Sequence, residues 1–234
     1  GVLFCVFTTL AAFGIGNMVQ SNAVAVIMHD SLGVQPWISG LIMTVLVALV
    51  ILGGIRSIAR VCERLVPFMA IAYVFGCIII LIANAPLIPG AIALIVKSAF
   101  TGHAALGGFA GVGVMQAMRF GVARGLFSNE SGLGSAPIVA AAAQTSNPVR
   151  QGLVSATGTF WDTVVICAVT GLVLVTCGDW MHAERDGAVL TRTAFAQIPW
   201  IGPSVLTFGL VTFVFSTILG WSYYGERAAE YLFG

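Results

Sequence analysis

Residues 125–137 form a polar, glycine-rich stretch between apolar segments, and the stretch carries an ionisable side chain, Glu130. It combines residues that disfavour a regular helix with hydroxyl and amide side chains that can replace lost backbone hydrogen bonds: Gly125, Gly132, Gly134 and Pro137, and Ser128, Asn129, Ser131 and Ser135. In lipid, unwound backbone is tolerated only where protein buries it or where it lines a wet cavity. The stretch therefore predicts a helix broken near mid-membrane, with free N–H and carbonyl groups available to a polar solute or an ion. A glycine-rich loop at the membrane edge is the alternative, although it would not explain the apolar segments on both sides.

Asp162 is a second candidate, because it lies near the centre of the apolar segment 153–175. An aspartate at that depth costs about 2.5–3.5 kcal/mol on insertion scales. One interpretation makes it a ligand of a coupling ion or a proton carrier, since hard cations prefer oxygen ligands. The other interpretation is an ion pair with Arg119 or Arg124. Glu130 has the same two interpretations, and neutralisation by Arg124 is favoured there.

Two further segments carry polar side chains within apolar surroundings. In the first, Asn17, Gln20 and Ser21 share a helix face at i, i+3 and i+4, and Gly16 would let another backbone approach closely. In the second, a pair of hydroxyl residues lies mid-membrane next to a glycine and a tryptophan: Ser216, Thr217, Gly220 and Trp221. Such hydroxyls usually bond to carbonyls of their own helix, and the tryptophan could instead belong to the interfacial aromatic belt.

The composition places the chain in a lipid bilayer, since 59% of residues are hydrophobic, 8% are charged and the mean hydropathy is +1.01. The net charge is +1 and basic residues form no run, so nucleic acid is not an expected partner. The five cysteines share no metal-ligand spacing and are interpreted as small hydrophobic residues. No nucleophile–base pair, phosphate-binding loop or cofactor motif is evident, so we do not expect an enzyme.

The apolar pattern predicts a single transmembrane domain over residues 1–234 with about six spanning segments. These are 2–27, 37–55, 65–83, a discontinuous helix at 106–143 whose second half is 133–143, 153–175, and 203–224. Arg56, Arg60 and Arg64 are expected in a short cytoplasmic connection. Residues 91–100 are expected along the outer interface, and 178–200 as an external loop. Because the sequence begins and ends abruptly in apolar runs, we expect a fragment.

Four stretches together resemble the sodium:alanine (alanine/glycine:cation) symporter family: residues 14–20, 121–137, 148–152 and 215–226. The long central stretch, which reads GVARGLFSNESGLGSAP, is the most specific of the four. The similarity covers nearly the whole chain. Ser131 and Val139 depart from the family pattern. This departure affects the expected substrate, but it does not affect the expected family membership.

The resemblance implies an all-α membrane protein with part of a leucine-transporter-like bundle, in which two five-helix units form an inverted repeat. It implies import of alanine or glycine with sodium across the cell (inner or plasma) membrane by a multi-pass protein with no cofactor besides the coupling ion. The family's opening helices, including the first discontinuous one, and its final helix would be missing here. The implied substrate-binding residues are Asn17, Gln20, Phe127, Ser128, Asn129, Gly132 and Trp221, and the implied ion-binding residues are Ser216 and Thr217 for sodium, with Asp162 as a further candidate.

Two other functions stay open at this point. Proton coupling through Asp162 would replace sodium coupling. A channel-like or scaffolding subunit would not transport at all, but a channel should show polar stripes along several helices. Here the polar residues concentrate at mid-depth, at Gln20, Asn129, Asp162 and Ser216, which is more typical of a binding site.

Overall fold

The computed structural model describes residues 1–100, 130–178, 187–198 and 202–234, and every regular element among them is a helix. No strand occurs in these ranges, which confirms the all-α prediction. The chain divides into two compact units, one made of residues 1–76 and 195–234 and the other of residues 77–194. Each unit is described by itself.

The first unit begins with one continuous helix made of α1 (Val2–Phe13), the π-helix η1 (Gly14–Met18) and α2 (Val19–Leu32). The helix ends at Gly33, whose φ of 66° is left-handed and whose N–H donates to the His29 carbonyl over 2.9 Å. The first span is therefore longer than the predicted 2–27. The turn that follows consists of the three residues 33–35, directly before Pro36.

Helix α3 (Pro36–Ile51) starts at a proline, and α4 (Gly54–Ala83) starts two residues after α3 and its C-cap Leu52. The prediction that Arg56, Arg60 and Arg64 lie in a connection is wrong, because all three lie in the first turns of α4. Gly54 has a φ of 66°, so the chain reverses within a few residues and leaves no room for a longer connection. At 30 residues, α4 is about 45 Å long, which exceeds the roughly 30 Å hydrocarbon core, so its first turns can extend beyond that core.

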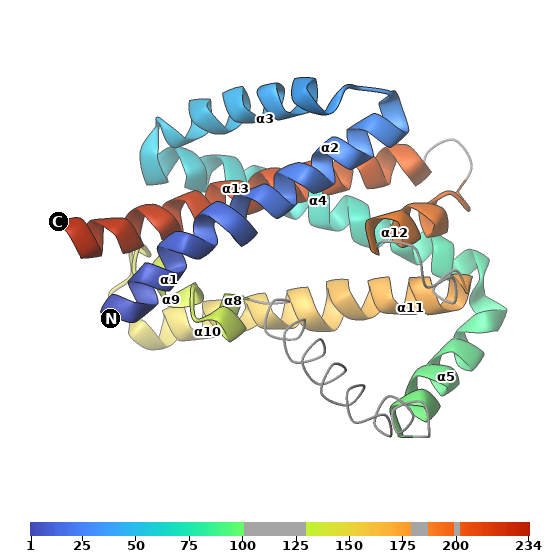
Figure 1. The fold of residues 1–234 in the computed structure, drawn as a ribbon. Coiled ribbons are helices and arrows are strands. Elements are labelled where there is room, and N and C mark those ends of the chain that lie inside the picture. Colours follow the sequence, from blue (N-terminus) through green and yellow to red (C-terminus); the bar gives the residue numbers. More distant parts are fainter. Residues whose placement is uncertain (101–129, 179–186, 199–201) are drawn as a thin grey trace, which may run out of the picture. The chain divides into compact units, whose positions relative to one another are not determined.

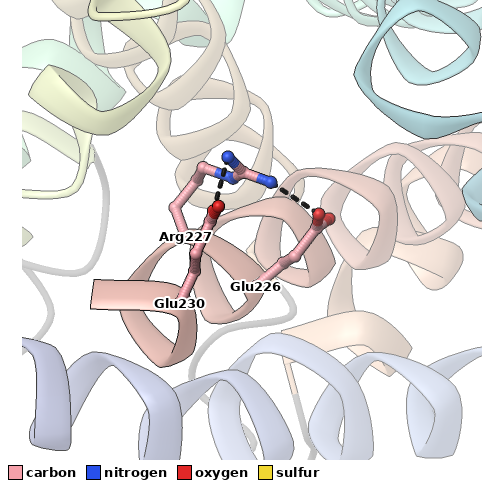
Figure 2. A network of polar contacts seen from close by, with 3 residues as sticks. All are labelled: Glu226, Arg227 and Glu230. Atoms are coloured by element: carbon pink, nitrogen blue, oxygen red, sulfur yellow. Dashed lines mark hydrogen bonds and ion pairs between the residues drawn. The ribbon is translucent and has the colours of Figure 1, made fainter. Parts of the chain in front are cut away.

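Helix α13 (Gly202–Phe233) is also longer than predicted, since it continues through Glu226 and Arg227. The Arg227 guanidinium bridges two carboxylates on its own helix, Glu226 at 2.7 Å and Glu230 at 2.6 Å (Figure 2). It also lies 5.5 Å from the centre of the Tyr223 ring. These contacts compensate most of the charge in the last turns of α13, so the helix continues beyond its apolar part.

Helix α13 packs along α1 and α2, and α3 packs against both α2 and α13 (Figure 1). The core of this unit contains Val24, Met43, Val214 and Ile218. The closest approach is at Gly16 in η1, where an added Cβ would lie 2.5 Å from the Cβ of Trp221. The expectation that Gly16 admits a close neighbour is confirmed, and the neighbour is Trp221 of α13.

Aromatic side chains join α4 to α13 within the same unit. Tyr73 meets Phe213 edge-on, with 5.9 Å between ring centres, and Phe68 meets Phe208 at 6.0 Å. Tyr73 also stacks on the fully buried Phe195 at 5.5 Å. The middle of α4 is thereby fixed against α13 by ring contacts, which are strong packing interactions in a chain with few charges.

The second unit contains η2 (Ala85–Leu87), α5 (Ile88–Phe100), α8 (Glu130–Leu133), α9 (Ala136–Ala140), α10 (Pro148–Thr159), the π-helix η3 (Phe160–Cys167) and α11 (Ala168–Cys177), with most of α12 (Gly187–Phe195). Helices α10, η3 and α11 form one continuous helix, and α5 packs along α11. Asn147 caps this helix, since its side-chain oxygen accepts from the Val149 and Arg150 N–H groups at 3.0 and 3.3 Å. The expected external loop 178–200 is partly wrong, because it contains α12.

Four of the described helices are long and apolar enough to cross a membrane: Val2–Leu32, Gly54–Ala83, Pro148–Cys177 and Gly202–Phe233. Large apolar side chains such as Leu3, Phe7 and Leu49 are mostly exposed, as expected for surfaces in contact with lipid. The protein is therefore an all-α membrane protein. The count of about six spans and the discontinuous helix at 106–143 remain predictions, because residues 101–129 lie outside the described ranges.

Two glycines of η1, Gly14 and Gly16, differ in the space that an added side chain would find. Gly16→Ala should lower the melting temperature of the purified full-length protein by several degrees, because overpacking against Trp221 costs about 1–3 kcal/mol. Gly14→Ala is the matched control, since a Cβ there meets nothing within 4 Å. Equal melting temperatures for the two variants in a thermal-shift assay would contradict the close contact.

Candidate functional site

Within the described residues of the glycine-rich stretch 125–137, a helix break lies at Gly134. Gly134 has a φ of 76° and separates α8 from α9, and the buried Ser135 directs both its N–H (3.2 Å) and its hydroxyl (3.4 Å) to the Glu130 carbonyl. The side chain thus replaces a helical hydrogen bond that the break removes. Residues 130–133 are themselves one helical turn, and Gly132 lies in it. Phe127, Ser128 and Asn129 lie outside the described residues.

The second half-helix is shorter than the predicted 133–143. Helix α9 has only five residues, Ala136–Ala140. The left-handed Gly134 prevents an earlier start, and Asn147 is held in an extended conformation before Pro148, which disfavours helix at that point.

Asp162 lies in the π-helix η3, and Asn17 lies in the π-helix η1. A π-helix inserts wider turns into an α-helix and often marks a functional position. The Asp162 residue is half-buried, and the two arginines considered as its partners are outside the described ranges. Both interpretations of Asp162, as a coupling group and as an ion-pair partner, therefore stay predictions.

The polar face around Asn17 divides into two parts. The Ser21 hydroxyl donates to the Asn17 side-chain oxygen over 3.1 Å, and both residues line a cavity between α1–α2, α3 and α13. Gln20 is not among the residues that line this cavity. Successive residues of an α-helix point about 100° apart, so Ser21 can face the cavity while Gln20 points elsewhere.

Gln20 carries an unusual acceptor. Its Oε1 atom is buried and has no hydrogen-bond partner. Among the described residues, it is the only buried side-chain oxygen or nitrogen without one. An acceptor left in this state costs about 1–3 kcal/mol. It is therefore suited to accept a hydrogen bond from the N–H group of a ligand.

Ser216 and Thr217 both donate to the Phe213 carbonyl, at 2.9 and 2.8 Å. The alternative considered above, that such hydroxyls bond to their own helix, is therefore what the structure shows. The bond does not exclude a role toward a cation, because the hydroxyl proton is directed at the carbonyl while the lone pairs of the oxygen remain available. These two residues can supply hard oxygen atoms but no free donor.

Trp221 is buried, with 8% of its surface exposed. Its ring meets Tyr224 edge-on at 5.6 Å, and its Cβ abuts Gly16. It is thus a packing residue between α13 and η1, which argues against a place in the interfacial belt. The site candidates of the first unit, Asn17, Gln20, Ser216, Thr217 and Trp221, all lie on α13 or on the helix that packs along it.

Long apolar helices interrupted by π-turns, with polar groups confined to a few positions, define an α-helical membrane protein built around internal polar sites. Comparison with known families makes the assignment specific, since the model of the sodium:alanine symporter family matches residues 1–234. The chain belongs to this family.

Three curated relatives illustrate the similarity. An uncharacterised transporter of Haemophilus influenzae is 52% identical over 99% of this chain and 52% of its own length. The sodium/alanine symporter AgcS of Methanococcus maripaludis is 48% identical over 100% of this chain and 51% of its own length. The probable sodium/glutamine symporter GlnT of Bacillus subtilis is 36% identical over 99% of this chain and 48% of its own length. The chain thus spans about half the length of these relatives.

A substitution at Gln20 separates a binding role from a structural one. If Gln20 accepts a hydrogen bond from a charged group of a bound solute, Gln20→Ala should weaken the binding of that solute, with alanine as the probe, about tenfold or more, because such a hydrogen bond contributes about 1.5–3 kcal/mol. Gln35→Ala is the control, since Gln35 is exposed ahead of α3. If Gln20→Ala leaves binding of the probe unchanged and only raises thermal stability, Gln20 has no part in binding.

Proposed function

We propose that this chain forms part of a sodium-coupled symporter that imports small neutral amino acids, alanine or glycine, as a multi-pass protein of the plasma membrane. The observation that carries the proposal is the family match over the whole chain. The relative named for sodium and alanine is also more similar to this chain than the relative named for glutamine. Membership of a transporter family favours transport over catalysis.

Gln20 provides the clearest means of binding the substrate. An amino acid at neutral pH carries an ammonium group with N–H donors, and the buried Oε1 of Gln20 is an acceptor without a partner. Asn17 is proposed to bind from the preceding turn, and Trp221 to close the site by its bulk. Phe127, Ser128, Asn129 and Gly132 are proposed to complete it from the broken helix.

Ser216 and Thr217 are the proposed protein hydroxyl ligands of sodium. Their protons are directed at the Phe213 carbonyl, so the lone pairs of both oxygens remain available to a hard cation, which prefers oxygen ligands. A zwitterionic amino acid has no net charge, so the membrane potential alone cannot concentrate it. The ion must therefore supply the driving force, and the remaining ligands would be carbonyls from other helices.

Proton coupling is the second candidate, and one observation favours it. Asp162 is an ionisable residue inside a π-helix, and it is the only charged residue in the part of that spanning helix from 151 to 177. Ionisable residues at such depth often carry protons or ions. In this alternative, Asp162 would bind a proton on the outer side and release it inside.

The coupling ion is tested by flux. The full-length protein in liposomes should accumulate labelled alanine when an inward sodium gradient is applied, and not when an inward proton gradient is applied in choline buffer. Accumulation driven by the proton gradient alone would replace sodium coupling with proton coupling. Exchange that needs no gradient and saturates with neither ion would exclude symport.

Thr217→Val removes one proposed sodium ligand while preserving shape. It should raise the sodium concentration needed for half-maximal uptake about tenfold, with a smaller effect on alanine affinity at saturating sodium, because the oxygen is lost and the packing is retained. Thr212→Val is the matched control, since the Thr212 hydroxyl also bonds to its own helix, to the Phe208 carbonyl at 2.8 Å. The same sodium dependence in both variants would remove Thr217 from the sodium site.

A further inference from the structure

Three exposed arginines form a stripe along the first turns of α4. Arg56, Arg60 and Arg64 recur at four-residue intervals, so they share one face of the helix over about 12 Å at 1.5 Å per residue. Within the described ranges, none of the three forms an ion pair or a side-chain hydrogen bond. Glu63 lies beside them, and it too forms no ion pair there. We refer to these three arginines as the arginine stripe.

The arginine stripe does not help α4 to fold. Like charges four residues apart on a helix repel each other, and the stripe contains two such pairs. Arg56 adds a further cost, because the first turn of a helix carries a partial positive charge from its free N–H groups. A bound anion would remove both costs, since it would neutralise the arginines and interact favourably with the helix dipole. The stripe therefore indicates an anionic partner.

The same face of α4 becomes apolar directly after the stripe. Phe68, Ile71 and Phe75 follow Arg64 at intervals of three or four residues, and they are 61, 69 and 63% exposed. From Arg64 to Phe75 the helix rises about 16 Å, which is about half of a hydrocarbon core of roughly 30 Å. The face thus offers positive charge at one end and then an apolar surface as long as one lipid leaflet.

We propose that the arginine stripe binds the phosphate group of an anionic phospholipid, with the acyl chains along Phe68, Ile71 and Phe75. Guanidinium groups match phosphate oxygens in paired hydrogen bonds. Because α4 is longer than the hydrocarbon core, its first turns can lie at the level of the lipid headgroups. Anionic headgroups attract basic side chains next to a membrane-spanning helix. The proposal does not depend on which amino acid or ion is carried.

A carboxylate elsewhere in the full-length transporter is the competing partner of the stripe, since this chain spans about half the length of its relatives. Such a carboxylate would neutralise the arginines, but it would leave the exposed apolar part of the face unexplained. A phospholipid accounts for both parts, because the charged and the apolar residues follow one another in the order of a headgroup and its chains.

Lipid binding to the full-length protein tests the proposal. Native mass spectrometry of the delipidated protein should show tighter binding of dioleoylphosphatidylglycerol than of dioleoylphosphatidylcholine, which has the same chains and no net charge. Arg60→Gln should weaken phosphatidylglycerol binding about fivefold, which corresponds to about 1 kcal/mol for one basic residue near an anionic surface. Arg60→Lys should weaken it less, because the charge remains while the paired hydrogen bonds are lost.

Arg150→Gln is the matched control and should leave phosphatidylglycerol binding unchanged. Arg150 is also an exposed arginine in the first turn of a helix, α10, but no basic residue lies four positions before or after it. An equal loss in Arg60→Gln and Arg150→Gln would overturn the proposal, because it would show general charge attraction in place of a site. Equal affinities of the wild-type protein for the two lipids would overturn it as well. Binding of glycerol phosphate as tight as that of the lipid would make the stripe a site for a soluble anion.

The stability of the lipid-free protein distinguishes the competing partner. Without lipid, Arg60→Gln should melt at the wild-type temperature or slightly above it, because the substitution removes a repulsion between like charges. A melting temperature several degrees below that of the wild type would show that Arg60 pairs with a carboxylate of the protein, and the lipid proposal would fail.

A photoactivatable lipid locates the acyl chains independently. Phosphatidylglycerol with a diazirine on one acyl chain should label the α4 segment that contains Phe68, Ile71 and Phe75 more than the corresponding phosphatidylcholine probe does. The excess should disappear when all three arginines of the stripe are replaced by glutamine. Equal labelling of this segment by the two probes in the wild-type protein would contradict the proposed position of the lipid.

Discussion

The contact between Gly16 and Trp221 sets the distance between α13 and the helix that starts the chain. No side chain fits at Gly16, so the backbone of η1 lies directly against the Trp221 side chain. The same pair of helices carries Asn17, Gln20, Ser216 and Thr217. In lipid there is no hydrophobic force between helices, and close packing of small residues is a main source of their association. The positions of these four candidates therefore depend on one glycine.

Two π-helices, η1 and η3, lie in different units of the chain. Each lies inside a long spanning helix, and each contains a polar residue of functional interest, Asn17 in η1 and Asp162 in η3. A π-turn widens the helix and changes the direction of the residues that follow. The widened turns allow a spanning helix to stay continuous while it carries a polar group.

The sequence predicts the helical class and the close approach at Gly16, because apolar run length and small-residue spacing directly reflect the lipid environment. The family is indicated separately, by the resemblance of four motif stretches. It places helix ends less well. Arg56, Arg60 and Arg64 resemble a connection by charge, yet they lie in α4, because a helix longer than the apolar core can carry charges at its end. The separation of Gln20 from Asn17 and Ser21 was also missed. Sequence spacing assumes 3.6 residues per turn, and no sequence pattern here indicated the π-turns.

We propose that sodium and alanine bind the same state of the protein, through helices that this chain contributes. Thermodynamic linkage then requires each ligand to raise the affinity for the other by the same factor. Calorimetric titration of the full-length protein should show that saturating sodium tightens alanine binding by a factor equal to that by which saturating alanine tightens sodium binding. Alanine affinity that is identical with and without sodium would contradict the account.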